Sequence, residues 1–352
     1  MGIKNLNKLL KDKCPELFQQ IHISDFSYKK VAIDISLYMF KFKAVCGDRW
    51  LTTFINLIAS LRRNEVHCVF IYDGKAPAEK DLEKAKRRED RTKLEENLYV
   101  LQEALDEYHK TGTIDKCLKD LYSKRKSPKR LLKPEDKSID MKWVEDKINQ
   151  KQGQIVYLSP EDFTNTKRLF DILKVPYYTA PDEAEKFCAQ LCINGLVDAV
   201  LSDDTDLIAY NTPTILSKMD TQTDNCILLT TDNILNQLNF TKEQLIDLCI
   251  MCGTDYNTNI NKIGPHTAYK LLEEHQNIEN ISSNTKHDIS ILNHERGRQL
   301  FTEFKDCDIK YIDYCGIPDF VELESFIAQF NITINMEQLK KNFGQEIILL
   351  ED

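Results

Sequence analysis

Short apolar runs that end close to aspartate are the most constraining pattern in this chain. Asp34 follows the run VAI, Asp73 follows VFIY, and Asp204 comes shortly after AVL. Apolar runs of this length predict short buried strands. The carboxyl ends of parallel strands share one edge of an open sheet, and ligands bind in the crevice beyond that edge. The sequence therefore predicts an α/β fold, in which a central, mostly parallel, twisted sheet is flanked by helices.

Seven acidic residues are expected to converge at this edge. They are Asp34, Asp73, Glu183, Glu185, Asp204, Asp206 and Asp255. Carboxylates a few ångströms apart raise one another's pKa, and divalent cations that prefer oxygen ligands relieve this cost. Two Mg²⁺ or Mn²⁺ ions about 4 Å apart would use this many carboxylates and would suit in-line attack on a phosphodiester. The alternative is a set of unrelated surface acids in loops that follow strands.

Composition indicates a reduced, soluble protein. With 352 residues, 42% of them hydrophobic, the chain can bury a large core, and we expect one catalytic domain. No run approaches the roughly 20 apolar residues of a membrane span, and the N-terminus has no signal-peptide core. An intracellular location is expected, with nucleus and cytoplasm both open. The odd count of 11 cysteines predicts core thiols, including Cys249 and Cys252, whose C-x-x-C spacing lacks a second pair for zinc.

Charge is distributed unevenly along the chain. The net charge is −9, and the seven acids account for all but −2 of it. Eight Lys or Arg residues against one acid lie between Lys116 and Lys133. Phosphate contact, a nuclear import signal and a solvated tail are all consistent with this run. The residues that we assign to DNA contact within it are Lys124, Arg125, Lys126, Lys129 and Arg130.

Hydrophobic periodicity predicts the order of the elements. Helices are expected at 6–13, 51–63, 78–108 and 161–173, and strands at 31–34, 66–73, 154–158 and 175–178. Pro181 is expected to open a helix that carries Glu183 and Glu185, because Pro is favourable in a first helical turn. Residues 109–153 are polar and basic and are predicted to be a mobile excursion.

Several motifs follow one another in a characteristic order. They are MGI (1–3), VAID (31–34), YDGKAP (72–77), APDEAE (180–185), SDDTD (202–206), LCIMCGTDY (248–256) and IGP (263–265). Through this series the chain resembles the flap endonuclease family of structure-specific 5′ nucleases, over residues 1 to about 275. The resemblance implies a PIN-like 5′ nuclease fold with a helical arch and a helix-two-turn-helix element. It also implies that all seven acids hold two metal ions, with Asp34, Asp73, Glu183 and Glu185 forming most of one site and Asp204, Asp206 and Asp255 completing the second.

The resemblance assigns further residues to the substrate. Lys80 and Arg87 are seven residues apart and share one helix face, from which they would reach the scissile phosphate; a solvated helix is the alternative. Phe40, or as a second choice Tyr38, would stack on a base next to the cut, with core packing as the alternative. Gly2, in the MGI opening, is assigned to DNA contact.

The segment around Gly264 is predicted to grip the duplex backbone. A tight Gly turn followed by Pro265 at a first helical position leaves backbone N–H groups free to face a phosphate. The residues assigned to this contact are Lys262, Gly264, His266 and Thr267. In the resembling family this element is the helix-two-turn-helix, and a bound K⁺ is implied there. An ordinary helix-turn-helix packing motif is the alternative.

The resemblance also suggests how the chain is divided. We expect an N-terminal nuclease region with the start of the arch (1–108), a basic arch or insertion (109–153), an internal nuclease region (154–275) and a C-terminal helical region (276–352). The interval from Asp34 to Asp73 is short for the family and that from Asp73 to Glu183 is long. No Q-x-x-L-x-x-F-F sliding-clamp motif is present. These departures indicate a divergent member, of the kind that a large DNA virus could encode.

The predicted function is a divalent-metal-dependent 5′ nuclease that cuts flap, nicked, gapped or branched DNA, as an endonuclease and as a 5′→3′ exonuclease. It would act as a monomer in DNA replication, repair or recombination. Two alternatives stay open, a 5′→3′ exoribonuclease and a non-catalytic scaffold that binds DNA junctions. A haloacid-type phosphatase would need a second aspartate where this chain has Ser36.

Overall fold

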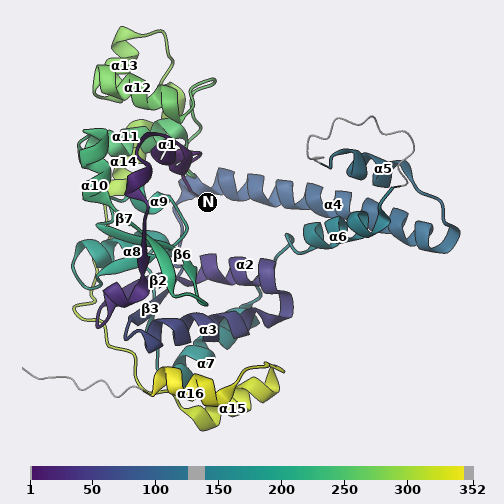
Figure 1. Cartoon of the computed structure of the whole chain (residues 1–352). Helices are drawn as coiled ribbons and strands as arrows, with labels where there is room; N and C mark the ends of the chain where they lie inside the picture. Colours follow the sequence, from purple (N-terminus) through teal and green to yellow (C-terminus); the bar gives the residue numbers. More distant parts are fainter. Residues whose placement is uncertain (1, 126–138, 345–352) are drawn as a thin grey trace, which may run out of the picture.

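A seven-stranded sheet forms the centre of the molecule (Figure 1). The structure, a computed structural model, describes residues 2–125 and 139–344. The strands are β1 (Gln19–His22), β2 (Lys30–Asp34), β3 (His67–Tyr72), β4 (Tyr177–Thr179), β5 (Ala199–Leu201), β6 (Thr214–Asp220) and β7 (Asn225–Thr230). Their order across the sheet is β1-β7-β6-β5-β2-β3-β4. The five adjacent strands β6, β5, β2, β3 and β4 pair in parallel. At one edge, β7 pairs antiparallel with both β6 and β1. The predicted α/β fold with a mostly parallel sheet is confirmed.

The register of the parallel strands brings their carboxyl ends together. β2 lies between β5 and β3, with Ile33 opposite both Leu201 and Phe70. All six residues of β3 are buried, as expected for a parallel strand that is covered on both faces. Asp34 at the end of β2 therefore lies at the same edge as the residues that follow β3 and β5.

Helices cover both faces of this sheet (Figure 1). In the first half of the chain they are α1 (Leu6–Lys13), α2 (Ile35–Cys46), α3 (Trp50–Arg63), α4 (Asp81–Thr111), α5 (Lys116–Ser123), α6 (Met141–Gln152) and α7 (Pro160–Leu173). In the second half they are α8 (Ala184–Ile193), α9 (Asp206–Ala209), α10 (Thr231–Leu238), α11 (Lys242–Cys252), α12 (Pro265–His275), α13 (Ile278–Asn284), α14 (His294–Thr302), α15 (Phe320–Gln329) and α16 (Met336–Phe343). Two large hydrophobic cores result, one built around α8 and α11 and the other around α3 and α7.

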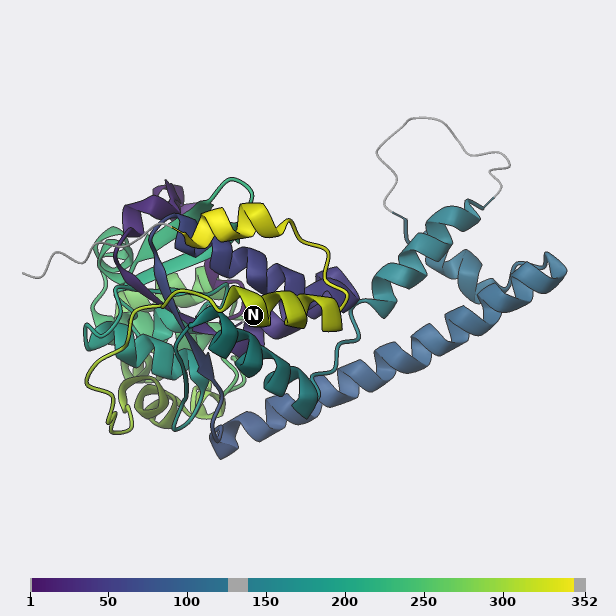
Figure 2. The same ribbon diagram turned by 90° about the horizontal axis from the view of Figure 1, so that it is seen from below.

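A helical projection extends from this body (Figures 1 and 2). The long helix α4 leaves the sheet edge, and α5 and α6 pack against its outer half around Leu98, Leu101, Leu118, Val144 and Ile148. The expectation of a long helix near 78–108 is confirmed. The expectation that residues 109–153 form a mobile excursion is wrong for the described part, because apolar residues at helical spacing in this polar segment form a small core of their own. Residues 126–138 lie outside the described part of the chain.

Other sequence expectations need correction. The segment 154–158 was expected to be a strand, but it has no strand conformation; Ile155 packs beside the α4 cluster and Leu158 against the core around α3. A short apolar run indicates contact with a hydrophobic core, but its periodicity does not distinguish a strand in the sheet from an irregular segment that packs on helices. Pro181 lies in a bend before α8, which begins at Ala184 with Glu183 as its N-cap residue.

The remaining chain-wide expectations concern thiols and membranes. All eleven cysteines are free, and Cys249 and Cys252 are buried in α11, which confirms their role as core thiols. Among the described residues, no helix has the length and apolar character that crossing a membrane requires. The proposed regional divisions at 108, 153 and 275 stay a prediction.

Candidate active site

Asp34 and Asp73 come from the ends of neighbouring strands. Asp34 caps α2, its Oδ1 accepting hydrogen bonds from the backbone N–H groups of Ser36 at 2.8 Å and Leu37 at 3.4 Å. Asp73 Oδ1 accepts a hydrogen bond from the backbone N–H of Ala184 at 2.9 Å, at the start of α8. These bonds link the ends of two parallel strands to the beginnings of two helices. The sheet edge and the helix N-termini together hold both carboxylates in place.

Gly74 allows the chain after β3 to pass close to the segment before α8. A Cβ atom at this position would lie 2.1 Å from the carbonyl oxygen of Ala180. The backbone N–H of Gly74 donates to the carbonyl of Asp182 at 2.6 Å. Only glycine permits this approach, which brings Asp73 beside the helix that carries Glu185.

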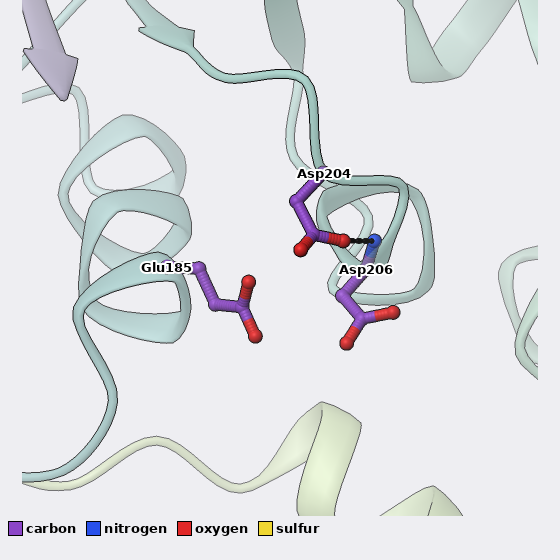
Figure 3. A group of neighbouring side chains, drawn as sticks. All are labelled: Glu185, Asp204 and Asp206. Atoms are coloured by element: carbon purple, nitrogen blue, oxygen red, sulfur yellow. Dashed lines mark hydrogen bonds between the residues drawn. The ribbon is translucent and has the colours of Figure 1, made fainter. Parts of the chain in front are cut away.

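The tightest group of acids lies between α8 and the loop that follows β5. Ligand oxygens of Glu185, Asp204 and Asp206 all lie within 4.8 Å of one another, and Figure 3 shows Glu185 pointing from α8 toward the two aspartates. Asp204 Oδ1 accepts the backbone N–H of Asp206 at 3.1 Å. This group combines one acid from the first predicted set of ligands with two from the second. The division of the seven acids between two metal sites stays a prediction.

Gly2 lies against the same loop. Its φ is +80°, and a Cβ atom on it would be 2.0 Å from Asp204 Oδ1 and 2.6 Å from Asp206 Oδ1. A side chain at this position would displace the aspartates. The structure thus places Gly2 at the acid cluster, where its small size has an evident packing role.

Two cationic side chains from the beginning of the projection face the acids. Lys80 Nζ lies 2.5 Å from Glu183 Oε1, 3.4 Å from Asp255 Oδ2 and 3.6 Å from Glu185 Oε1. Arg87 donates from Nη2 to Asp255 Oδ2 at 2.6 Å. The hypothesis that Lys80 and Arg87 share a helix face toward the acids agrees with these contacts, and the solvated-helix alternative does not.

Most of these groups line one cavity of about 760 Å³. Six of the seven acids line it, together with Lys80 and Arg87, while Asp206 is buried behind it. Phe40 also lines the cavity and is 42% exposed, so core packing does not explain it. Sequence reasoning missed Lys84 and Arg91, which line the same cavity. The helical spacing of both from Lys80 and Arg87 was the signal that could have found them.

The electrostatics of the cluster favour a divalent cation. Burial, followed by the charge of Asp73, raises the pKa of Asp34 to about 8. Burial and the neighbouring aspartates raise the pKa of Glu185 well above its usual range, and burial together with Asp204 does the same for Asp206. Burial alone would lower the pKa of Lys80, yet Glu185 and Glu183 raise it overall. Raised carboxyl pKa values mean that the ionised forms of these acids are unfavourable here unless a positive charge lies nearby.

One atom of the cluster supports the same conclusion independently of pKa. Asp206 Oδ1 is buried and has no hydrogen-bond partner among the described residues. A buried carboxylate oxygen without a partner is costly unless a cation contacts it. The donor set is composed of oxygens, which suits Mg²⁺ or Mn²⁺. The residues present therefore fit the metal that the fold implies.

The other predicted DNA contacts lie on two separate elements. Gly264 is the N-cap residue of α12, but the left-handed φ of this turn belongs to Lys262 (65°), whereas Gly264 has a φ of −98°. The expected tight Gly turn is therefore wrong in its detail. His266 Nε2 lies 3.1 Å from Asp12 of α1, and Thr267 is exposed. The structure leaves Lys262, His266 and Thr267 at the surface.

The described part of the basic run lies at α5, away from α8 and α9 (Figure 1). Lys124 is exposed, and Arg125 lies over the rings of Tyr122 and Trp143. Lys126, Lys129 and Arg130 fall outside the described residues. The described residues of this run, 116–125, do not reach the acid cluster.

Comparison with known proteins places this site in a family. The XPG N-terminal domain matches residues 1–94, and the XPG I-region matches residues 174–255. The chain is 32% identical to the probable RAD2-like endonuclease 369L of Invertebrate iridescent virus 6, over 97% of this chain and 92% of the relative. The chain belongs to the RAD2-like and flap endonuclease family. Flap endonuclease 1 of Zea mays is 30% identical, over 94% of this chain and 83% of that protein.

A solved structure of this family shares the fold. The catalytic core of Rad2 in complex with DNA substrate superposes with a TM-score of 0.68 at 18% identity, over 97% of this chain and 98% of that one. Membership of the RAD2-like and flap endonuclease family makes the chain a structure-specific 5′ nuclease. These comparisons do not favour the exoribonuclease or the non-catalytic scaffold. The similarity to a viral relative agrees with the expectation of a divergent member.

Proposed function

We propose that the chain is a divalent-metal-dependent nuclease that cuts flap, nicked, gapped or branched DNA, with endonuclease and 5′→3′ exonuclease modes. The observation that carries this proposal is that six of the seven acids line one cavity with Lys80 and Arg87, while the seventh, Asp206, lies beside Glu185 and Asp204. Glu185, Asp204 and Asp206 would hold one Mg²⁺ or Mn²⁺ ion. The remaining acids, Asp34, Asp73, Glu183 and Asp255, would serve a second. Bound divalent cations would neutralise phosphodiester charge and activate a water for attack.

The protein groups around the metals would orient the substrate. Arg87 on α4 and Lys80, the N-cap residue of α4, both reach the acids, so a scissile phosphate in the cavity would lie close to both positive charges. They would stabilise charge that develops on the phosphoryl oxygens. Phe40, on α2 at the cavity wall, would stack on the base beside the cut, because every base presents a face to an aromatic ring. Lys84 and Arg91 would continue the row of positive charge along α4.

Duplex contact would come from the exposed surface outside the cavity. The N-terminus of α12, with Lys262, Gly264, His266 and Thr267, would face backbone phosphates, since free N–H groups and the helix dipole favour anions there. A K⁺ ion at this element is part of the proposal. Lys124 and Arg125, with Lys126, Lys129 and Arg130, would add contacts from the projection. The enzyme would act as a monomer, without a sliding-clamp motif, in replication, repair or recombination.

The experiment is a substrate panel with the purified chain. Flap, nicked, gapped and four-way DNA, each labelled at the 5′ end, would be incubated with Mg²⁺, with Mn²⁺ and with chelator, beside an RNA version of the flap. Cleavage of branched DNA that chelator abolishes is the expected result. Preferential degradation of the RNA would favour the exoribonuclease instead. Tight junction binding without cleavage in either metal would favour the scaffold.

A further inference from the structure

A chain of hydrogen bonds between buried side chains ends at Glu183 of the acid cluster. Tyr256 Oη donates to Glu183 Oε2 at 2.5 Å, and the hydroxyl of Tyr210 lies 2.8 Å from that of Tyr256. Tyr256 follows α11, Tyr210 is the C-cap residue of α9, and Glu183 is the N-cap residue of α8. Three elements distant in sequence therefore meet at one carboxylate.

The direction of these bonds follows from the chemistry of the groups. Both oxygens of Glu183 accept, Oε1 from Lys80 Nζ at 2.5 Å and Oε2 from Tyr256 Oη. Tyr256 must give its one hydroxyl proton to Oε2. The oxygen of Tyr256 can then only accept from Tyr210, which makes Tyr210 the first donor of the chain. Hydrogen bonds linked in this way strengthen one another in a buried setting.

Packing fixes both phenol rings. Tyr256, Tyr210 and Glu183 are 8%, 1% and 4% exposed. The ring of Phe301, on α14, contacts both tyrosines edge to face, at 5.4 Å from the centre of Tyr256 and 5.1 Å from that of Tyr210. Edge-to-face contact is a favourable arrangement of aromatic rings. A helix from the C-terminal region thus supports the tyrosine pair behind Glu183.

We propose that Tyr256, supported by Tyr210, is a positioning residue: its hydrogen bond to Glu183 Oε2 fixes the carboxylate, so that Oε1 is the oxygen left to contact a cation. This inference rests on the proposed metal dependence. Lys80 Nζ donates to Glu183 Oε1 and Tyr256 Oη donates to Oε2, so one oxygen already faces positive charge while the other faces Tyr256. Groups that orient metal ligands typically contribute 10–100-fold to metal affinity or activity.

The test measures Mn²⁺ binding directly, by the EPR signal of the free ion, in full-length protein without DNA. Tyr256→Phe should weaken Mn²⁺ affinity by about 10–100-fold. Tyr210→Phe should weaken it less, because Tyr256 keeps its bond to Glu183. The matched control is Tyr269→Phe on α12, a buried tyrosine that donates to Glu273 and should leave affinity unchanged. Cleavage by Tyr256→Phe should fall at limiting Mn²⁺ and recover at saturating Mn²⁺.

The outcomes separate this inference from the proposed function. Wild-type protein that binds no Mn²⁺ would overturn the metal dependence itself. Normal Mn²⁺ affinity in Tyr256→Phe, with a folded variant and a binding wild type, would overturn only the positioning role. Equal losses in Tyr256→Phe and Tyr269→Phe would also overturn it, since general loosening would then explain both. If Tyr256→Phe does not fold, Tyr210→Phe decides, and unchanged affinity in that variant counts against the proposal.

Discussion

Arg87 and Asp255 are joined by a hydrogen bond of 2.6 Å although 168 residues separate them in sequence. Arg87 belongs to the helix that projects from the body, and Asp255 follows α11 inside it. Burial would lower the pKa of Arg87, but the charge of Asp255 raises it overall. This contact attaches the base of the projection to the acid cluster. A substrate phosphate would compete with Asp255 for the same guanidinium group.

The role of Arg87 can be tested by single-turnover cleavage at saturating enzyme. Arg87→Ala should slow the chemical step by about 10²-fold or more, the typical loss for one charge-stabilising group. Affinity for DNA should change little. Arg88→Ala is the control, because Arg88 is exposed and lies on the same helix. An unchanged rate constant in Arg87→Ala would remove Arg87 from the proposed mechanism.

Replacing metal-binding acids should separate binding from cleavage. Asp204→Asn and Glu183→Gln should each abolish cleavage and leave DNA binding intact, because these side chains are assigned to metals rather than to phosphates. Asp203→Asn is a matched control in the same loop; its carboxylate bonds to Lys41 Nζ at 2.5 Å and to the backbone N–H of Lys218. Gel-shift and cleavage assays would compare the three. Near-normal turnover in Asp204→Asn would show its assignment to be wrong.

The raised pKa of Asp34 predicts how stability depends on pH when metal is removed. A carboxyl with a pKa of about 8 in the folded chain and 3.8 in a model peptide binds more protons in the folded state between these values. The free energy of unfolding therefore falls as pH rises through this window. In chelator, Asp34→Asn should raise the Tm at pH 8 and change it little at pH 4. Asn can still cap α2, so the helix start is retained.

An acid with the opposite shift provides the control for this measurement. Burial raises the pKa of Asp162, but the hydrogen bond from Lys43 and those at Ser159 lower it overall. Asp162→Asn should therefore lower the Tm at pH 8. Thermal melts of both variants across pH would give opposite signs. A lower Tm for Asp34→Asn at pH 8 would contradict the assignment of charge repulsion at the cluster.

The basic run should supply salt-dependent affinity. Each phosphate contact steepens the slope of log K against log salt by about 0.9. Reversing Lys124, Arg125, Lys126, Lys129 and Arg130 to Glu should weaken binding to all duplex substrates and flatten this slope, while cleavage at saturating enzyme stays largely intact. Reversing Lys340 and Lys341 on α16, at the opposite part of the molecule (Figure 1), is the control. Unchanged affinity would leave a localisation signal or a solvated loop as the function of the run.

The sequence by itself determined the neighbouring parallel strands β2, β3, β4 and β5 and the acids that follow them, whereas strands β1, β6 and β7 were not expected from it. Apolar runs before Asp34, Asp73 and Asp204 are local patterns, and parallel strands must end at a common edge, so the cluster followed from residue order. Lys80 and Arg87 were placed on one face because helical spacing is also local. The core assignment of Cys249 and Cys252 rested on the same kind of periodicity.

Only the tertiary structure decided which partners these elements contact. The apolar run at 154–158 joins no strand of the described sheet, and its Ile155 and Leu158 are partly buried against helices. The described part of the polar segment after 109 forms helices because α4 offers it an apolar face. The bond from Tyr256 to Glu183 joins positions 73 residues apart, and no local pattern specifies it. The grouping of Glu185 with Asp204 and Asp206 likewise depends on how α8 packs beside the loop after β5. Sequence spacing gives the direction of a side chain within its element, whereas packing between elements sets the distances on which metal binding depends.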